Sequence, residues 1–532
     1  MSGFLFFGCN DAGPDTDGGG PAGGKADTPE SQGEPSIYAV GNRLSPPKTG
    51  DRYVDNVQPV IARNCVTCHG CGDAPCQLKL TSFEAVLRGS NEDDLYATRV
   101  FGIDREYDPM HLAYGRVLAE DGSIDYAKSE ERWRDHDFYS IIKHATDSLL
   151  GRVLTEAHDV TTDFDQAYEL SENLASRDFE CSASDSPDGD VMVGRAMPLG
   201  LPALEQEGTD AIVSWLEDGA AGPSSEAHLA IAQPTNANAV RDWENFFNTA
   251  QADPRDKVVA RYLYEHLFFA HLHLQRSPGE FYRLVRSRTK DGNIDEIVTE
   301  RAFDLPEEDE YFYRLQKVTS VLVAKSHIPW KLDQDTMDRW KALFLDAEWT
   351  LEDNPHYEPD SDNPFGYFAA IPANLRYRFM IENSKHLVDG MVRGSVCTGS
   401  GATFAIRDRF WVWFMDPDSD VSALDTVAGE FTGGPRLGES SWFHLNPESA
   451  NPIREVDYLD AYREQMQKQH PDGIGIEDLW DGDDGENPNA WLTVLRHQKS
   501  ATVHNGPLAG QPETIWILGY SNFERLYYDL VV

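Results

Sequence analysis

The stretch that most constrains this 532-residue chain is NCVTCHGCGDAPC, residues 64–76, which places four cysteines and one histidine in thirteen positions. Within it, Cys65, Cys68 and His69 form the pattern C-x-x-C-H, which is typical of covalent c-type haem attachment. In such a site two thiols bond the macrocycle, and the adjacent histidine is an axial ligand of the iron. We therefore predict a haem-binding domain that carries covalent haem c.

Two other metal centres use similar spacings. Cys65, Cys68 and Cys71 also fit the C-x-x-C-x-x-C run of iron–sulfur proteins, with Cys76 as a candidate fourth ligand. An iron–sulfur protein exported in folded form would need a twin-arginine signal, and none is visible. A zinc module would need a distant second pair of ligands. With haem favoured, the remaining cysteines are candidates for disulfides whose connectivity the sequence leaves open: Cys71, Cys76, Cys181 and Cys397.

Residues 197–220, MPLGLPALEQEGTDAIVSWLEDGA, predict a Met-Pro turn followed by an amphipathic helix. This segment resembles the C-terminal end of a class I cytochrome c, in which a methionine in a loop is the sixth iron ligand. The resemblance implies Met197 as the second axial ligand beside His69. We therefore expect a multidomain protein that begins with an all-α, cytochrome c-like haem domain over residues 36–222, with an insertion between its two motifs.

Residues 1–35 differ in composition from the rest of the chain. A short apolar run ends at Phe7-Gly8-Cys9 and continues into a tail rich in Gly, Asp and Pro. The run resembles the end of a bacterial lipoprotein signal, in which the cysteine becomes the lipidated first residue. We expect a periplasmic protein that is lipid-anchored through Cys9, with the tail as a disordered tether.

The charge of the chain excludes one class of partner. It has 46 basic and 90 acidic residues, for a formal net charge of −44. Binding to nucleic acid requires clustered Lys and Arg against the phosphates, and no such cluster is present, so we expect no nucleic-acid partner. No apolar run reaches the ~18 residues that a membrane-spanning helix needs.

Residues 223–532 are expected to form an α+β domain. Residues 257–274, KVVARYLYEHLFFAHLHL, are apolar almost all round, which predicts one buried helix. On it, Arg261 and Glu265 have the i, i+4 spacing of an ion pair. His266 and His273 are too far apart along a helix to share one metal easily, so a buried, hydrogen-bonded histidine is the better interpretation.

The segment FYRLVRSRT, residues 281–289, interleaves arginines with apolar residues and predicts a strand or a strand edge. In so acidic a protein, Arg283, Arg286 and Arg288 could hold a carboxylate or phosphate head group by bidentate hydrogen bonds. They could equally pair with nearby Asp and Glu. The sequence leaves both interpretations open.

Seven stretches, taken in order, resemble one known family: NCVTCHGCGDAPCQLKL, MPLGLPAL, ARYLYEHLFFAHLHL, FYRLVRSRT, MVRGSVCTG, FWVWFMDPD and NAWLTVLRHQKSATV. Together they are similar to the bacterial cis/trans isomerases of unsaturated fatty acids, which are periplasmic haem proteins. The resemblance implies that cis double bonds of fatty acids or phospholipid acyl chains are converted to trans at a membrane surface.

The resemblance carries over the haem residues as Cys65, Cys68 and His69. Catalytic residues beyond the haem are not implied, and the candidates are the charged residues of the second domain: Arg261, Glu265, His266, Arg286 and Arg288. The family continues past the segment that resembles TIWILGYSNFERLYYDLVV. We therefore expect the chain to be shortened at its C-terminus.

Three other functions compete with fatty acid isomerisation. The main alternative is an electron-transfer c-type cytochrome fused to a binding domain. A bacterial haem peroxidase is disfavoured because the chain has one C-x-x-C-H where such enzymes carry two. A nicotinamide dehydrogenase is disfavoured because GEFTGGPRLG, residues 429–438, does not fit G-x-G-x-x-G.

Overall fold

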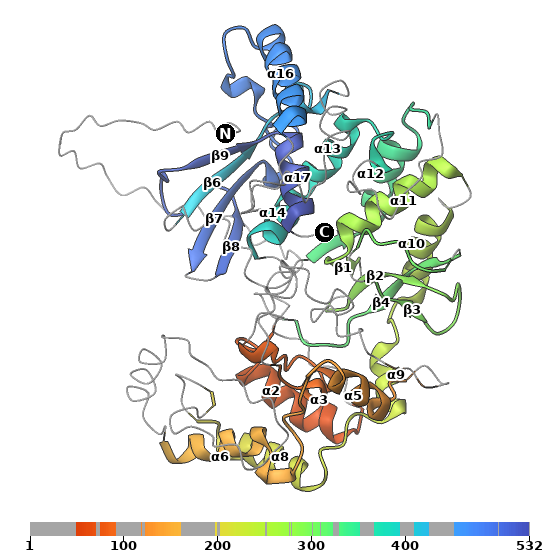
Figure 1. The fold of residues 1–532 in the computed structure, drawn as a ribbon, viewed down its shortest axis with the longest axis vertical. Coiled ribbons are helices and arrows are strands. Elements are labelled where there is room, and N and C mark those ends of the chain that lie inside the picture. Colours follow the sequence, from red (N-terminus) through yellow and green to blue (C-terminus); the bar gives the residue numbers. More distant parts are fainter. Residues whose placement is uncertain are drawn as a thin grey trace, which may run out of the picture.

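The structure, a computed structural model, describes residues 49–530 except 71–74, 92–116, 118, 120–122, 161–196, 199–202, 250–252, 276, 278, 300–301, 309, 323–328, 352–366, 394–408, 425–451 and 498–499. Figure 1 shows two lobes: a smaller one built from helices near the N-terminus, and a larger one with two sheets and their covering helices. The described residues therefore combine helices with mixed sheets, which confirms the predicted α+β character.

The first lobe is helical over its described residues, with one isolated bridge between Ser90 and Tyr139. Its core gathers aromatic rings: the centroid of Tyr53 lies 5.1 Å from that of Phe83 and 5.5 Å from that of Trp215. Its elements are η1 (Tyr53–Val57), α2 (Gln58–Asn64), η2 (Pro75–Gln77), α3 (Phe83–Arg88), α5 (Tyr126–Arg134), η3 (Ala145–Asp147), α6 (Leu149–Val160), α8 (Gln206–Glu217) and α9 (Ser225–Ala232).

The first sheet of the second lobe is mixed. Its strand order is β3-β2-β1-β5, and β4 pairs with β2 as well; β1 and β5 are parallel, and the other pairs are antiparallel. The strands are β1 (His271–Leu274), β2 (Phe281–Ser287), β3 (Glu296–Ile297), β4 (Phe312–Lys317) and β5 (Pro329–Leu332). Helices α10 (Ala237–Thr249), α11 (Pro254–Leu267) and α12 (Gln334–Trp340) pack on β4, β2 and β5 respectively.

The second sheet has the order β8-β7-β6-β9, with β6 and β9 parallel. Its strands are β6 (Arg409–Phe414), β7 (Trp491–His497), β8 (Ser500–Asn505) and β9 (Ile515–Leu518). Along β6, Phe410, Val412 and Phe414 are buried and alternate with less buried residues, as expected when one face of a sheet meets the core. The remaining elements are η5 (Lys341–Leu345), α13 (Ala373–Glu382), α14 (Ser384–Arg393), η8 (Val421–Ala423), α16 (Pro452–Gln469), η9 (Ile476–Asp478), η10 (Pro488–Ala490) and α17 (Tyr520–Leu530).

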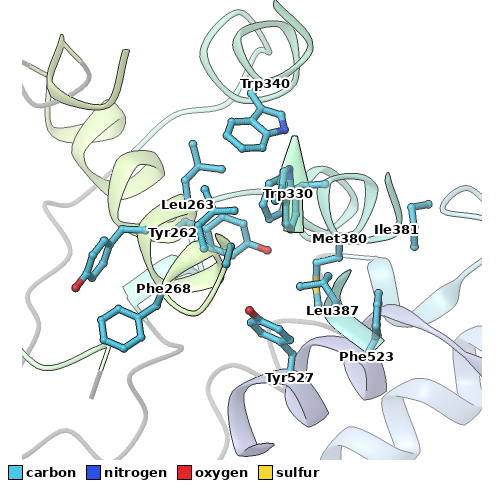
Figure 2. Close-up of a cluster of buried hydrophobic side chains, with 14 of the residues drawn as sticks. Tyr262, Leu263, Phe268, Trp330, Trp340, Met380, Ile381, Leu387, Phe523 and Tyr527 are labelled. Carbon is cyan, nitrogen blue, oxygen red and sulfur yellow. The ribbon is translucent and has the colours of Figure 1, made fainter. Parts of the chain in front are cut away.

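One continuous hydrophobic core joins both sheets and their helices. Figure 2 shows part of it, with side chains from α11, β5, α12, α13, α14 and α17 gathered around Trp330. The ring of Phe379 lies 5.5 Å from both Trp330 and Trp340. Because aromatic side chains bury large apolar areas, this packing makes the second lobe one structural unit.

The two lobes also meet through short contacts. Val321, which follows β4, packs into the core of the first lobe, and its N–H donates to Thr81 O at 2.8 Å. The second lobe thus contributes a residue to the hydrophobic core of the first.

Three sequence predictions can be compared with these elements. The helix after Met197 is α8, and the strand over residues 281–289 is β2, so both predictions are confirmed. The prediction of one helix over residues 257–274 was wrong in its second half, because α11 ends at Leu267 and His271–Leu274 form β1. The backbone of β1 pairs with β2 and β5, and this pairing outweighs the helical pattern of the apolar residues.

A search of the described helices found no membrane-crossing segment, since none combines the length and the apolarity that a bilayer requires.

Gly89 ends α3 at a position that no other residue fits. Its φ is +81°, and a Cβ placed there would lie 1.8 Å from the carbonyl oxygen of Tyr139. We expect Gly89→Ala to lower the free energy of unfolding by more than ~2 kcal/mol, because backbone strain and a backbone clash add. Urea unfolding followed by tryptophan fluorescence measures the change.

Gly219→Ala is the matched control. Gly219 has a φ of +93°, but a Cβ there would have nothing within 4 Å. Both variants carry the strain of a positive φ, so the difference between them measures the clash with Tyr139. Equal losses of stability in the two variants would contradict the assigned close approach.

Candidate functional site

The C-x-x-C-H motif forms a compact turn directly after α2. The N–H of Cys65 donates to Ile61 O at 2.9 Å, and the N–H groups of Cys68 and His69 donate to Cys65 O at 3.1 and 3.0 Å. Neither thiol is in a disulfide. Burial raises the pKa of the Cys65 thiol to about 12, and the neighbouring Cys68 adds to this rise, so Cys65 is a protonated thiol at neutral pH.

His69 is buried, with 8% of its surface exposed, and its ring is held by the backbone. Its Nδ1 lies 3.0 Å from the carbonyl oxygen of Leu78. Because a carbonyl only accepts hydrogen bonds, Nδ1 carries the proton, and Nε2 of the neutral ring has the lone pair that ligates a metal. A backbone acceptor on the second nitrogen is what orients metal-binding histidines in general. The residues of this turn therefore fit a haem with His69 as an axial ligand.

The structure describes only some of the other residues that were predicted to lie near the haem. Cys76 is disulfide-bonded. Met197 is half-buried, and its N–H donates to Val153 O of α6 at 3.2 Å. Its role as the second axial ligand stays a prediction. Residues Cys9, Cys71, Cys181 and Cys397 lie outside the described part of the chain.

Arg261 and Glu265 of α11 form the ion pair that their spacing predicted. Arg261 Nε lies 2.7 Å from Glu265 Oε1, and both side chains are buried. Arg261 also donates to Phe303 O at 2.8 Å and lies 4.3 Å from the ring centroid of Tyr367. Burial alone would lower the pKa of the Arg261 guanidinium, but the neighbouring Glu265 raises this pKa above its ordinary value, so the guanidinium stays charged.

His266 belongs to a second buried charge cluster. Its Nδ1 lies 2.8 Å from Tyr262 O, and its Nε2 lies 3.2 Å from Glu524 Oε1 of α17. The Tyr262 hydroxyl donates to the same Glu524 oxygen at 2.8 Å, and Arg376 of α13 lies 3.7 Å from the other oxygen. The His266 ring stacks on Tyr527 with centroids 5.4 Å apart. Three helices therefore meet at one carboxylate, which joins residues far apart in the sequence.

The contacts of Glu524 determine whether its carboxyl group is charged. Burial raises the pKa of Glu524, but hydrogen bonding to His266 and the charges of Arg376 and His266 hold it below its ordinary value. The carboxylate is therefore ionised. Nδ1 of His266 faces a backbone carbonyl and Nε2 faces this carboxylate, so both ring nitrogens point at oxygen atoms. The buried, hydrogen-bonded His266 was predicted from the sequence, whereas Glu524 was missed because it stands out only as an acidic residue within an otherwise apolar helix.

The three arginines of β2 and its end have different surroundings. Arg283 lies 3.3 Å from Glu296, and Arg288 is exposed and pairs with Asp295 and Glu308. Arg286 is fully buried and donates only to the backbone carbonyls of Asp304 and Ala302. Pairing with local acids, one of the two interpretations that the sequence left open, therefore holds for Arg283 and Arg288 but not for Arg286.

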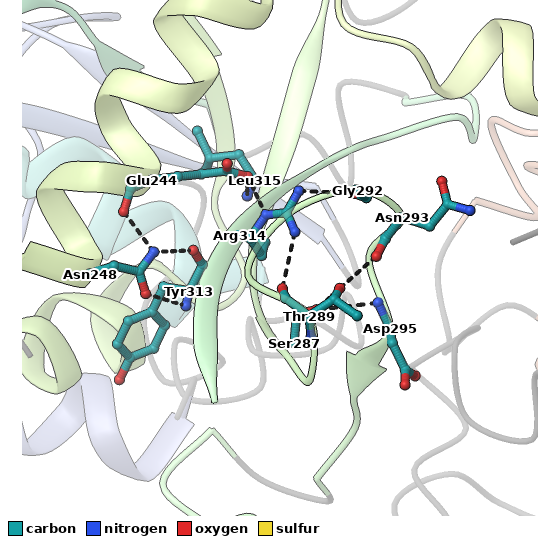
Figure 3. A network of polar contacts seen from close by, with 10 residues as sticks. All are labelled: Glu244, Asn248, Ser287, Thr289, Gly292, Asn293, Asp295, Tyr313, Arg314 and Leu315. Atoms are coloured by element: carbon teal, nitrogen blue, oxygen red, sulfur yellow. Dashed lines mark hydrogen bonds and ion pairs between the residues drawn. The ribbon is translucent and has the colours of Figure 1, made fainter. Parts of the chain in front are cut away.

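A cleft of about 1240 Å³ lies between the lobes, lined by α5, α9 and the edge of the first sheet. Figure 3 shows the polar network along its wall. Arg314 Nε lies 2.9 Å from Glu244, and its other nitrogens donate to Thr289 O and Gly292 O. The lining also includes apolar side chains such as Leu229 and Leu315. The wall therefore mixes charged groups with apolar surface.

Comparison with known proteins gives one match. A family model described as fatty acid cis/trans isomerase matches residues 123–532. The matched range contains the two buried ion-pair clusters and the β2 arginines, and it begins after the C-x-x-C-H turn at residues 65–69. No curated protein and no solved structure matches the chain.

The Glu524 carboxylate gives a prediction for stability and its pH dependence. We expect Glu524→Gln to lower the free energy of unfolding by ~3–5 kcal/mol at pH 7, because it leaves His266 and Arg376 buried without their anion. Since the folded pKa is below the unfolded value of ~4.3, the carboxylate stabilises the fold above that pH. This contribution is lost as pH falls through the folded pKa, so the difference between wild type and variant should shrink there.

Urea unfolding at a series of pH values measures both effects. Glu464→Gln, an exposed position on α16, is the control and should change stability by less than ~0.5 kcal/mol. A Glu524→Gln protein as stable as the control at pH 7 would contradict the assigned cluster.

Proposed function

Since the chain belongs to the fatty acid cis/trans isomerase family, we propose that it converts cis double bonds in the acyl chains of membrane lipids to trans with a covalent haem c. The family match by itself makes the chain an enzyme that acts on unsaturated fatty acids. The observation that supports the haem is the turn at Cys65, Cys68 and His69, with two unbridged thiols and a histidine whose Nδ1 faces the Leu78 carbonyl.

Each residue of the turn has a separate task in this proposal. Cys65 and Cys68 would hold the macrocycle by thioether bonds, and His69 would ligate the iron through Nε2 while Leu78 O keeps the imidazole ring in place. When bound, the haem supplies an iron that weakens the alkene π bond and so permits rotation about C=C. No proton has to move in a cis-to-trans rotation, so the buried ion pairs of the second lobe are not required as acid or base.

Met197 is our proposal for the second axial ligand, on the resemblance of its segment to cytochrome c. The helix that follows, α8, packs its Trp215 against Tyr53 of η1, directly before α2 and the haem turn. An iron–sulfur cluster is the weaker reading of the same motif, because the disulfide at Cys76 removes its fourth ligand.

The domain division is also a proposal: a tether over residues 1–35, a cytochrome c-like haem domain over 36–222 and the isomerase domain over 223–532. The helices of the first lobe support an all-α haem domain. The family match begins at residue 123, inside this domain. Part of the haem domain therefore belongs to the unit that the family shares.

We place the protein in the periplasm, anchored to a membrane surface through lipid on Cys9. The disulfide at Cys76 supports an oxidising compartment, since disulfides persist there and are rare in the cytosol. A single lipid chain binds membranes reversibly, so a second contact from the protein is needed for stable attachment. The proposed substrate, the acyl chains of membrane lipids, also lies at that surface.

The alternative, an electron-transfer cytochrome fused to a binding domain, is favoured by one observation. The C-x-x-C-H turn lies outside the range that the isomerase family matches. This alternative predicts that haem is present and that lipid composition does not change.

The deciding experiment uses the haem-loaded full chain and vesicles of cis-monounsaturated phospholipid, with fatty acids analysed by gas chromatography. We expect trans product from the wild type and at least tenfold less from Cys65→Ser/Cys68→Ser, whose loss of covalent haem is checked by its absorption spectrum. His504→Gln, a histidine of the second sheet, is the control and should keep the activity. Trans product at the wild-type level without covalent haem would contradict haem dependence. No trans product from a fully haem-loaded wild type would favour electron transfer.

A further inference from the structure

The cleft between the lobes is richer in cations than the chain as a whole. Among the described residues that line it, five are Lys or Arg and five are Asp or Glu. The whole chain has 46 basic and 90 acidic residues. A surface with the composition of the chain would hold roughly two acids for each base, so positive and negative charges balance in the cleft although they do not balance in the protein.

Helix α5 and its C-cap present both signs of charge on the wall of this cleft. Lys128 and Arg132 are four residues apart, and so are Glu131 and Asp135, which places all four side chains on one face of the helix. All four are exposed, whereas Trp133 is buried on the other side. A basic pair and an acidic pair therefore lie next to each other along the cleft.

Three of these four side chains have charges that the protein itself leaves unpaired. Lys128 Nζ lies 2.8 Å from a carboxylate oxygen of Asp125. Glu131, Arg132 and Asp135 make no ion pair with any residue that the structure describes. An unpaired cation and two unpaired anions are therefore available to a ligand on one wall of the cleft.

The charges around these three are already compensated. Glu130 of α5, which is outside the lining, lies 2.6 Å from Lys143 and 3.8 Å from Arg134. On the sheet side, Arg314 lies 2.9 Å from Glu244 (Figure 3). The other Lys, Arg, Asp and Glu residues of the described lining likewise have ion-pair partners. The unpaired charges of the lining are thus confined to the α5 wall.

Apolar side chains line the same cleft. They come from four places in the fold: Ile124 before α5, Leu229 of α9, Val240 of α10 and Leu315 of β4. The cleft has a volume of about 1240 Å³, above the ~300–1,000 Å³ of ordinary small-molecule sites. It therefore has room for a polar head group and for part of an acyl chain.

We propose that the α5 wall binds the head group of an intact zwitterionic phospholipid of the phosphatidylethanolamine type, with the phosphate at Arg132 and the ammonium group at Glu131 and Asp135. The proposal rests on the membrane-lipid substrate of the proposed function and names the class of lipid that presents the acyl chain. Neighbouring side chains on one helix face are ~5–6 Å apart, which suits two charges joined by a two-carbon link. The acyl chains then lie along the apolar part of the lining.

Lipids with other charges match this wall less well. A guanidinium such as that of Arg132 binds phosphate oxygens by paired hydrogen bonds, and the carboxylates of Glu131 and Asp135 accept hydrogen bonds from a primary ammonium. An anionic lipid has the phosphate but leaves both carboxylates beside a negative charge. A diacylglycerol has neither charge. Charge complementarity therefore selects the zwitterion.

Binding of short saturated lipids tests the assignment, because these lipids cannot be isomerised. Dihexanoyl phosphatidylethanolamine, dihexanoyl phosphatidylglycerol and dihexanoylglycerol are titrated against the haem-loaded full chain by calorimetry, each below the concentration at which it aggregates. An exposed ion pair is worth up to about fivefold in affinity, so we expect the phosphatidylethanolamine to bind about fivefold more tightly than the phosphatidylglycerol and about tenfold more tightly than the dihexanoylglycerol. Equal affinities, or tighter binding of the phosphatidylglycerol, would overturn the proposal.

Two variants of the α5 wall locate the head group. Arg132→Gln should weaken both phospholipids by about fivefold and leave dihexanoylglycerol unchanged, because only the contact with the phosphate is lost. Glu131→Gln/Asp135→Asn should remove the preference for phosphatidylethanolamine over phosphatidylglycerol. A folded Arg132→Gln protein that binds both phospholipids as tightly as the wild type would count decisively against the site.

Arg463 and Asp460 of α16 provide matched controls. They are exposed, form an ion pair three residues apart on a helix, and lie outside the described lining of the cleft. Arg463→Gln and Asp460→Asn should leave the affinities for all three lipids unchanged. If they reduce phospholipid binding as much as the α5 variants do, the effect comes from the overall charge of the protein, and the proposal fails.

Failure of this proposal can be told apart from failure of the proposed function. The comparison of the three lipids on the wild type needs no variant, and a saturated lipid binds without turnover. Loss of isomerase activity with a retained preference for phosphatidylethanolamine would count against haem-dependent isomerisation alone. Isomerisation without any head-group preference would count against the α5 site alone.

Discussion

The need to compensate buried charge organises the larger lobe of this protein. Helix α11 places Arg261 and His266 in the core. Burying a charge there without a partner would cost several kcal/mol of folding free energy. Arg261 is paired within its own helix by Glu265. His266 depends on Glu524, which α17 brings from the far end of the chain. The fold of the lobe thus has to close its C-terminal helix onto α11, and the aromatic core packs around that contact (Figure 2).

The C-x-x-C-H turn depends on local contacts only. Residues 61–69 are joined by helical hydrogen bonds, and the contact that orients His69 reaches only to Leu78. Such a turn can present its thiols and its imidazole whatever the rest of the chain does. This is consistent with its place upstream of the range that the isomerase family matches.

The first lobe contains the C-x-x-C-H turn, and a cleft separates the two lobes. The cleft between them is bounded by α5 and α9 on one side and by the first sheet on the other. Its sheet side is fixed by Glu244, Asn248 and Arg314, whose contacts join α10 to β4 and to the turn after β2 (Figure 3). Arg286, on β2 of the same sheet, is fully buried and donates to the backbone carbonyls of Asp304 and Ala302.

Features that depend on neighbouring residues could be predicted from the sequence. The C-x-x-C-H motif, the i, i+4 pair of Arg261 and Glu265, the helix after Met197 and the strand at residues 281–289 follow from spacing within one turn or one strand. The family resemblance was likewise carried by short stretches in order, and the family match confirms it.

The remaining features depend on how distant segments pack together. His271–Leu274 became a strand because partners on β2 and β5 satisfy its backbone, which no local pattern announces. Glu524 reaches His266 across 258 positions, and Arg286 differs from Arg283 and Arg288 only in what packs around it. Pairing of charges across a core depends on which elements meet, and that is set by the packing of the whole chain rather than by any segment.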